Sequence, residues 1–343
     1  MSSAPPPLPP PSGAEIARDA AWLAQALDPA AGIVRMIAMT PEEYRSASFL
    51  DDRMLQQPVT AAALLPWGEV AAAFGPMERD DARWIFHIGH VGSTLVARLL
   101  GELQSVLSVR EPRFLRDLTA LDAGQRATYI PATRKLFSRS FAADQLALVK
   151  ATSFVSEIAA ELLATDGRAL FVYASPRYYI ASILAGENSV LELDALAPSR
   201  AERMAGRVDQ FAQPRNHADL AAAAWACELT SLEAAAQKLP HARIMWVDFD
   251  QLLSDVEGGL KRIAHGLEID GSANELADLA DSPLLKRYSK ALEFAYSASL
   301  RRDLINEAGA NFGSEIDGAL DLLGASAETS PLLAQALRRA GEN

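Results

Sequence analysis

Hydrophobic residues from about position 83 onward fall into short continuous runs that alternate with segments of helical periodicity. The runs have the length of strands and cover residues 84–88, 106–109, 146–149, 169–173 and 243–247. The helical segments cover residues 93–103, 178–185, 200–211, 218–238 and 255–266. Near-continuous apolar strands separated by helices are typical of a parallel sheet that is covered on both faces. The pattern therefore predicts an α/β fold with a central parallel sheet of about five strands flanked by helices.

The first 80 residues show a different pattern. Residues 1–13 are rich in proline, which favours an extended, disordered tail. Residues 14–80 alternate helical and turn signals, among them a helical period over 14–27 and a Thr40-Pro41 pair typical of a helix start. We therefore predict three parts, which are a disordered tail over 1–13, a mainly helical N-terminal extension over 14–80, and the α/β domain over 81–343.

Composition and charge narrow the class of protein. The chain has 343 residues and a formal net charge of −12, and such an acidic balance argues against a nucleic-acid partner. Cys227 is the only cysteine, so no intrachain disulfide can form, and we expect it to be a buried structural thiol. No apolar stretch approaches the ~18 residues of a membrane span, and the start does not resemble a signal peptide. We expect a cytoplasmic protein without a membrane partner, and the sequence leaves the oligomeric state open.

The turn after the first predicted strand is the strongest candidate for a binding site. It contains Gly89, His90, Val91 and Gly92, and Ser93 and Thr94 then open a helix. A glycine-rich turn at a helix N-terminus presents free backbone N–H groups and the positive end of the helix dipole, which suits a phosphate or a sulfate. The lysine of a Walker A loop is absent. The segment therefore predicts an anion cradle that is not built for ordinary ATP hydrolysis.

Three ionisable residues near this cradle are candidates for catalysis. His90 lies inside the turn and could contact a transferring group, or be only a turn residue that tolerates an unusual backbone. Glu111 follows the second strand, where it could be a general base or a salt-bridged loop acid. Lys150 ends the third strand, where it could neutralise a developing anion or extend along the sheet edge. Parallel strands bring such residues to one edge of the sheet, so we expect a shared pocket.

Further polar residues could form a second anion subsite. Arg177 and Ser182 follow the fourth strand, and basic clusters stand at residues 286–290 and 301–302. The cluster residues proposed to close over a nucleotide are Lys286, Arg287 and Lys290. The five histidines show neither His-x-x-x-His nor carboxylate pairing at ligand spacing, so we expect no metal.

Several of these segments, in this order, resemble the motifs of bacterial sulfotransferases. Residues 86–100 resemble the 5′-phosphosulfate-binding loop of that family, and Arg110-Glu111-Pro112 resembles its Ser-Glu-Pro element. Residues 146–153, 173–182 and 247–253 are similar to its lysine-containing strand end, its 3′-phosphate segment and the element before its last main helix. The resemblance covers roughly residues 83–300. It implies the family's P-loop NTPase-like fold.

The resemblance also implies a function. The donor would be 3′-phosphoadenosine 5′-phosphosulfate, the acceptor a hydroxyl or amine of a small molecule, and no metal would be required. The loop with Ser93 and Thr94 would hold the 5′-phosphosulfate, Glu111 would be the acceptor base, and Ser182 would contact the 3′-phosphate. The acceptor surface would come from the N-terminal region and a loop near 187–198.

The sequence departs from the family pattern at two positions. His90 replaces the basic residue of the loop, and Ala174 stands where an arginine is expected eight residues before Ser182, with Arg177 offset by three. Loss of a bidentate phosphate clamp removes a strong, oriented interaction. Two alternatives therefore stay open, which are a catalytically degenerate nucleotide-binding or interaction protein of the same fold, and a small-molecule kinase.

Overall fold

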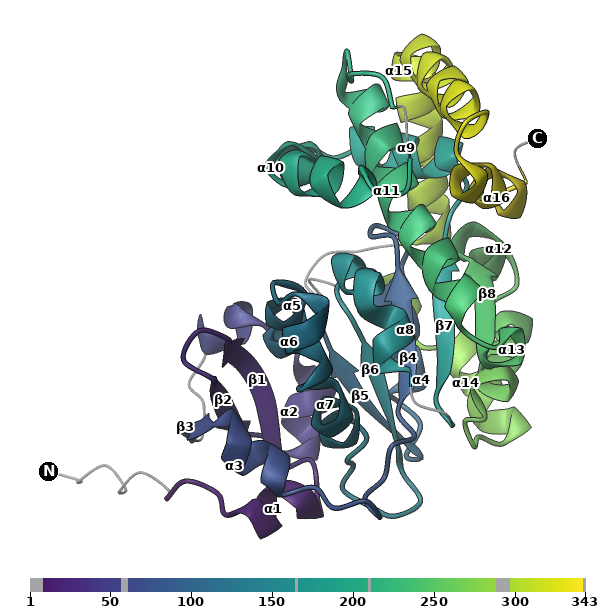
Figure 1. Ribbon diagram of the computed structural model, residues 1–343. Coiled ribbons are helices and arrows are strands. Elements are labelled where there is room, and N and C mark those ends of the chain that lie inside the picture. The colour runs from purple at the N-terminus through teal and green to yellow at the C-terminus, as the bar shows by residue number, and fades with distance from the viewer. Residues whose placement is uncertain (1–8, 57–60, 164–165, 209–210, 288–296, 342–343) are drawn as a thin grey trace, which may run out of the picture.

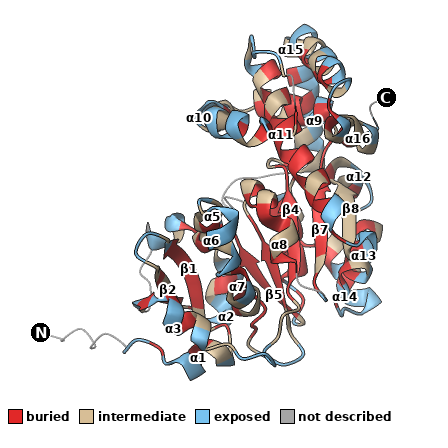
Figure 2. Ribbon diagram, in the orientation of Figure 1, coloured by how far each residue is buried: buried red, intermediate tan, exposed pale blue. Residues whose placement is uncertain are grey.

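Five parallel strands form the centre of the molecule. The computed structural model describes residues 9–56, 61–163, 166–208, 211–287 and 297–341. The sheet has the order β5-β6-β4-β7-β8 (Figure 1). Its strands are β4 (Arg83–His87), β5 (Val106–Arg110), β6 (Leu146–Lys150), β7 (Arg168–Tyr173) and β8 (Ile244–Asp248). Each begins and ends within one residue of its predicted run, so the predicted parallel sheet is confirmed. The four strands β4 to β7 are almost completely buried, as the hydrophobic runs require (Figure 2).

Helices pack around this sheet and over one end of it. The helices α4 (Ser93–Leu100), α9 (Pro176–Leu184), α11 (His217–Lys238) and α13 (Val256–Leu267) follow the predicted helical segments. The others in the domain are α5 (Arg113–Thr119), α6 (Ala123–Ala127), α7 (Ile130–Phe137), α8 (Ala159–Leu162), α10 (Glu187–Met204), α12 (Phe249–Ser254), α14 (Ala273–Ala280), α15 (Ala298–Ala327) and α16 (Pro331–Arg339), with 3-10 turns η2 (Ser153–Ile158), η3 (His241–Arg243) and η4 (Pro283–Lys286). The long α11 is buried on most of its surface and packs against α9, α10, α15 and α16. This helical layer stands above the sheet in Figure 1.

Helix α10 corrects the expectation of a loop near 187–198. The helix continues through Pro198, which is in its interior, and ends at Met204, whereas the sequence predicted a helix over 200–211. Proline removes only one backbone donor, and the packing of α10 against α11 buries Leu193, Arg200 and Met204. This packing outweighs the local preference for a break.

The N-terminal extension is not mainly helical, so that prediction is wrong. It contains an antiparallel sheet of β1 (Trp22–Asp28), β2 (Ile33–Ala38) and β3 (Ala62–Pro66), together with α1 (Gly13–Arg18), α2 (Pro41–Ser46), η1 (Asp52–Gln56) and α3 (Trp67–Ala72). The predicted helix over 14–27 ends at Arg18, and β1 follows because pairing with β2 and packing against α5 bury five consecutive residues. The predicted cap is confirmed, since Thr40 forms a capping box with Glu43. Of the predicted tail, residues 1–8 lie outside the described residues.

Two buried arginines attach this N-terminal region to the α/β domain. Arg110, the last residue of β5, donates to the carbonyl oxygens of Tyr44, Arg45 and Ala47 at the C-terminal end of α2. Burial lowers the pKa of Arg110 to about 9. Arg139 donates in the same way to carbonyl oxygens around α1 and β1. These bonds fix the N-terminal region beside β5 and so place η1 next to the residue that follows Arg110.

Candidate active site

The loop between β4 and α4 has the geometry of an anion cradle. Gly89, His90 and Gly92 have φ angles of 82°, 52° and 63°, so three of its residues adopt the left-handed conformation. Gly92 is the N-cap of α4 and makes no side-chain cap. The first N–H groups of a helix have no intrahelical partner, so α4 leaves those of Ser93 and Thr94 at the loop without a backbone acceptor of its own. Backbone donors and the positive end of the helix dipole converge here.

Gly92 is required by a neighbouring ring as well as by its backbone angle. A Cβ built on Gly92 would lie 1.9 Å from Cζ of Phe249, which is inside the ring's own volume. Phe249 begins α12 directly after β8 and is 2% exposed. Its ring therefore covers the cradle on the side of β8, and only a glycine fits beneath it.

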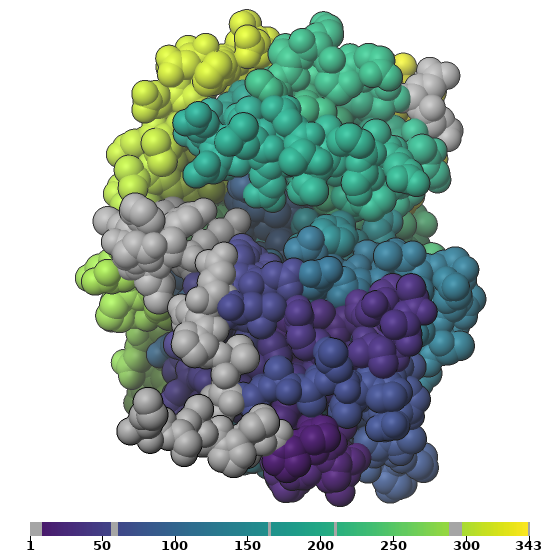
Figure 3. Space-filling model, turned by 90° about the vertical axis from the view of Figure 1, so that its left-hand side faces the viewer, coloured from purple at the N-terminus to yellow at the C-terminus, as the bar shows by residue number. Residues whose placement is uncertain are grey.

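A cavity of about 710 Å³ opens above the loop, between the sheet edge, the N-terminal region and the helical layer. Figure 3 shows the surface recessed between the N-terminal region and the teal and green helices above it. The predicted site residues that line the cavity are Gly89, His90, Val91, Gly92, Ser93, Thr94, Glu111, Lys150, Ser182 and Arg287. Residues predicted from five separate segments thus share one cavity.

Two described residues of the predicted site are not part of this lining, and a third predicted residue is not described. Arg177 is exposed and forms an ion pair with Asp317 of α15, at 2.8 Å between Nη2 and Oδ1. Lys286 is exposed to solvent and does not line the cavity. Lys290 lies outside the described residues. The structure therefore does not bring Arg177 or Lys286 to the loop.

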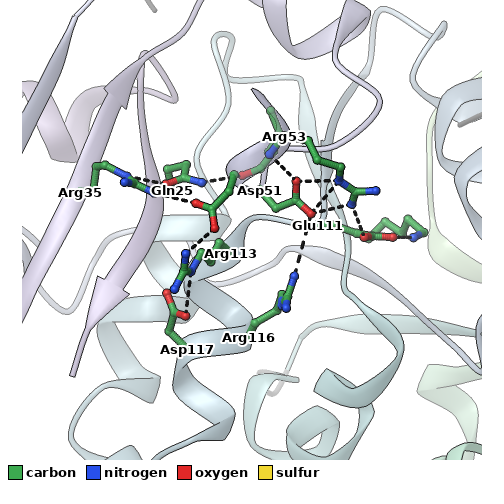
Figure 4. A network of polar contacts seen from close by, with 11 residues as sticks. Gln25, Arg35, Asp51, Arg53, Glu111, Arg113, Arg116 and Asp117 are labelled. Carbon is green, nitrogen blue, oxygen red and sulfur yellow. Dashed lines mark hydrogen bonds and ion pairs between the residues drawn. The ribbon is translucent and has the colours of Figure 1, made fainter. Parts of the chain in front are cut away.

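Lys150 and Glu111 form a buried ion pair at the edge of the sheet. Lys150 ends β6 and its side chain is 1% exposed, and its Nζ donates to Oε1 of Glu111. Glu111 has a φ of 54° and donates its backbone N–H to the carbonyl oxygen of Lys150 at 2.7 Å. Arg53 of η1 lies 3.4 Å from the second carboxylate oxygen (Figure 4). The Glu111 carboxylate is thus held between two cations and faces the cavity.

His90 and His87 have different surroundings. The side chain of His90 is 14% exposed, and its Nε2 lies 3.7 Å from Oε2 of Glu192 on α10. His87 accepts a hydrogen bond from the N–H of Gly89 through Nδ1 and so donates through Nε2 to the carbonyl oxygen of Ala151, both at 2.9 Å. His87 is therefore the hydrogen-bonded core histidine that its place in the strand predicts, and it occupies the N–H of Gly89.

Two hydroxyl groups beside the loop lack hydrogen-bond partners. Thr94 is 2% exposed, and its buried Oγ1 bonds to no other described residue. The buried Oγ1 of Thr152, just after β6, also has no hydrogen-bond partner among the described residues. Both residues line the cavity. A buried hydroxyl without a partner is costly, and an anion in the cradle would satisfy both.

The position at which the family pattern has its arginine is buried. Ala174 is fully buried, and its carbonyl oxygen accepts a hydrogen bond from Nε1 of the buried Trp225 at 3.0 Å. Position 174 therefore supplies no cation to the second predicted anion subsite. Ser182 lines the cavity, but its Oγ donates to the carbonyl oxygen of Tyr179.

Sequence reasoning missed several cavity residues. Arg53 and Arg116 come from η1 and α5, and Glu192 comes from a helix that was predicted as a loop. Phe249 belongs to a segment that the family resemblance marked, but its contact with Gly92 had no local signal. The tertiary fold brings Arg53 within 3.4 Å of Glu111 and Arg116 within 4.0 Å of Asp51, and no local sequence signal marks either contact.

The described part of the chain has no group of three or more His, Cys, Asp or Glu side chains that could hold a metal ion. None of the helices in that part combines the length and apolar character needed to cross a membrane.

Comparisons with known proteins give likenesses at the level of structure. No family model matches the chain, and no curated protein matches its sequence. The sulfotransferase domain from the curacin biosynthetic pathway is similar with 13% identity and a TM-score of 0.40, over 69% of this chain and 98% of that chain. Sulfotransferase STF9 from Mycobacterium avium shows 12% identity and a TM-score of 0.39, over 69% and 78%. Mouse sulfotransferase SULT7A1, complexed with PAP, shows 11% identity and a TM-score of 0.37, over 76% of this chain and 89% of that chain. Likenesses of this size carry no argument about function, which must come from the residues of the cavity.

Proposed function

We propose that this protein transfers a sulfuryl group from 3′-phosphoadenosine 5′-phosphosulfate to a hydroxyl or amine of a small molecule. The observation that carries the proposal is the cradle on the central strand, which lacks a Walker lysine and shares its cavity with the buried Lys150–Glu111 pair. Sulfuryl transfer needs an anion site, an acceptor base and a cation for the leaving group, and the cavity contains all three residue types.

The loop binds the 5′-phosphosulfate of the donor. The first-turn N–H groups at Ser93 and Thr94 donate to it, and the helix dipole adds a favourable field. The unpartnered Oγ1 atoms of Thr94 and Thr152 give further donors on the same side. These groups donate hydrogen bonds to the oxygens of an anion without the mobile side chain that a Walker lysine would supply.

Glu111, Lys150 and His90 have separate roles in the transfer. The acceptor oxygen attacks sulfur, its proton goes to Glu111, and the bond between sulfur and the bridging oxygen breaks. His90, Lys150 and the loop N–H groups stabilise the negative charge that develops on the bridging and equatorial oxygens. A histidine fills this role as a hydrogen-bond donor or in its protonated form, and Glu192 lies 3.7 Å from Nε2 of His90.

One observation favours a second candidate, a protein of the same fold that binds a nucleotide weakly and transfers nothing. Ala174 stands where the family pattern has an arginine, and Arg177 is engaged with Asp317. Neither residue therefore supplies the clamp expected for a 3′-phosphate. Among the described residues, Arg287 and Arg301 also line the cavity.

Calorimetric titration with adenosine 3′,5′-bisphosphate, beside ATP with Mg²⁺, tests the proposal. Binding of the bisphosphate alone supports a sulfotransferase donor site, whereas binding of neither supports the non-catalytic protein and binding of ATP alone supports a kinase. Gly92→Glu should abolish bisphosphate binding, because the side chain would enter the cradle with a negative charge. Gly309→Glu is the matched control, since it adds the same charge on exposed α15 with nothing within 4 Å of its Cβ.

A further inference from the structure

The strand order divides the cavity into two ends. The anion loop follows β4, the middle strand, while Glu111 and Lys150 follow β5 and β6 on one side of it. Phe249 follows β8 on the opposite side. The N-terminal region closes the β5–β6 end, where the N–H of Leu50 donates to the carbonyl oxygen of Arg110 at 2.8 Å. Since Glu111 is the acceptor base of the proposed function, this is the end at which an acceptor binds.

Within the described residues, the ion-pair network at the β5–β6 end has one more cation than carboxylate, since five cations share four carboxylates: Arg35, Arg53, Arg113, Arg116 and Lys150 against Asp51, Asp52, Asp117 and Glu111. Three of these cations line the cavity together with the carboxylates of Asp51, Asp52 and Glu111. Arg53 donates through Nε to Asp51 at 2.8 Å, and Lys150 pairs with Glu111, so both carboxylates already have a cation (Figure 4). The neighbouring Asp52 is engaged by Arg35 and Arg113 instead. The third cation is Arg116.

Arg116 has no hydrogen bond for its guanidinium group within the described residues. Its one ion-pair partner within the described residues is Asp51, whose Oδ2 lies 4.0 Å from Nη1, too far for a hydrogen bond. Asp51 is 7% exposed and is already bound by Arg53. The ring of Phe154 lies 5.4 Å from Cζ of Arg116, and the side chain is 44% exposed. A guanidinium fork therefore faces the cavity with its N–H groups available.

Such a fork fits one chemical class of ligand. Its parallel N–H groups match the two oxygens of a carboxylate, and a charge-assisted bidentate pair is stronger than neutral hydrogen bonds. Across the cavity, Glu192 is occupied with His90, so it does not neutralise Arg116 by direct contact. An acceptor with a carboxylate would complete the charge balance at this end and leave its hydroxyl free to approach Glu111.

We propose that the acceptor is a hydroxy acid whose carboxylate is bound by Arg116. The inference rests on the proposed function only in giving the bound acid the role of acceptor, since the binding of a carboxylate at Arg116 can be measured without any transfer. It predicts a preference for acids over their neutral amides, which are equal in shape but lack the charge.

The test measures binding of a set of aromatic and aliphatic hydroxy acids, including 4-hydroxybenzoate, each beside its amide. The wild-type protein should bind at least one acid about ten- to a hundredfold more tightly than its amide, because a charge-assisted pair has that strength. Arg116→Ala should lose this ratio. Arg113→Ala is the matched control, since Arg113 lies on the same helix, bonds to Asp52 and Asp117, and does not line the cavity.

Three results would overturn the inference. One is that no acid of the set binds more tightly than its amide, and another is that Arg113→Ala loses the preference as Arg116→Ala does. The last is that Arg116→Ala loses affinity for adenosine 3′,5′-bisphosphate, which would assign Arg116 to the donor. The same titration in the wild-type protein separates the two proposals, because failure to bind the bisphosphate counts against the proposed function while a preference for acids would stand.

Discussion

The substitution Gly92→Ala tests whether the cradle depends on the packing of Phe249. The added Cβ would lie 1.9, 2.0 and 2.6 Å from three atoms of the Phe249 ring, so the ring must move. Phe249 is 2% exposed and has little space to move into. Gly92 also has a φ of 63°, which a residue with a Cβ adopts only at a cost.

The magnitude follows from these two contributions. The left-handed conformation costs an L-residue about 1–2 kcal/mol. Forcing extra volume into a packed site costs about 1–3 kcal/mol. Gly92→Ala should therefore lower the free energy of unfolding by about 2–5 kcal/mol, measured by urea unfolding. Affinity for adenosine 3′,5′-bisphosphate should fall as well, because a displaced ring distorts the loop.

Gly89→Ala separates the two contributions. Gly89 has a φ of 82°, but its Cβ would meet only Oγ of Ser153 at 4.0 Å, so this variant has the backbone cost alone. The double variant Gly92→Ala/Phe249→Ala removes the clash, so it should be more stable than the sum of the two single effects predicts. Equal losses for Gly92→Ala and Gly89→Ala, or simple additivity in the double variant, would refute the role of Phe249.

Three further predictions concern buried groups. Lys150→Met should lower the free energy of unfolding by about 3–5 kcal/mol, while Lys150→Met/Glu111→Leu should recover most of it; an equal loss in both would show that the pair is not a buried ion pair. A hydrogen bond from Arg215 lowers the pKa of Asp219 below its ordinary 3.8. The ionised carboxylate therefore contributes fully to stability above pH 3.8, and this contribution is lost as the pH falls below that value. The difference in Tm between wild type and Asp219→Asn should narrow below pH 3.8, and a constant difference would contradict the prediction. Burial raises the pKa of Cys227 to about 12, so this thiol should react with a disulfide reagent only after unfolding, and rapid reaction of the native protein would contradict its burial.

The parallel sheet could be predicted from the sequence because its strands are buried on both faces. Such strands are hydrophobic at nearly every position, so their ends coincide with the ends of the runs. Strand β1 could not be distinguished in this way, since its alanines and leucines also fit a helical period. Its pairing with β2 and its contact with α5 decide the outcome, and neither is a local property. Helix α10 was missed for a related reason, because Pro198 predicts a break that packing against α11 overcomes.

Most of the residues that were predicted for the candidate site and that line the cavity stand at strand ends. The loop, Glu111 and Lys150 all stand at strand ends, and parallel strands bring such positions to one edge. Arg53 and Arg116 do not stand at strand ends. Arg53 reaches the cavity because Arg110 and Arg139 fix the N-terminal region beside β5, and Arg116 reaches it from α5, the helix after β5. The sequence spacing between Arg177 and Ser182 could not predict where the Arg177 side chain lies. Its partner is Asp317 on α15, which stands 140 residues later in the chain.

The position of the anion loop in the sheet explains how one cavity could serve two substrates. A loop after an edge strand would have strand ends on one side only, whereas the loop after β4 has β6 and β5 on one side and β7 and β8 on the other. The β5–β6 end is rich in charge, and the opposite end has the Phe249 ring with Arg301 5.2 Å from its centre. In the proposed reaction the acceptor and the nucleoside of the donor approach the loop from these opposite ends. This is the arrangement that in-line transfer needs, because the attacking and leaving oxygens must lie on opposite sides of sulfur.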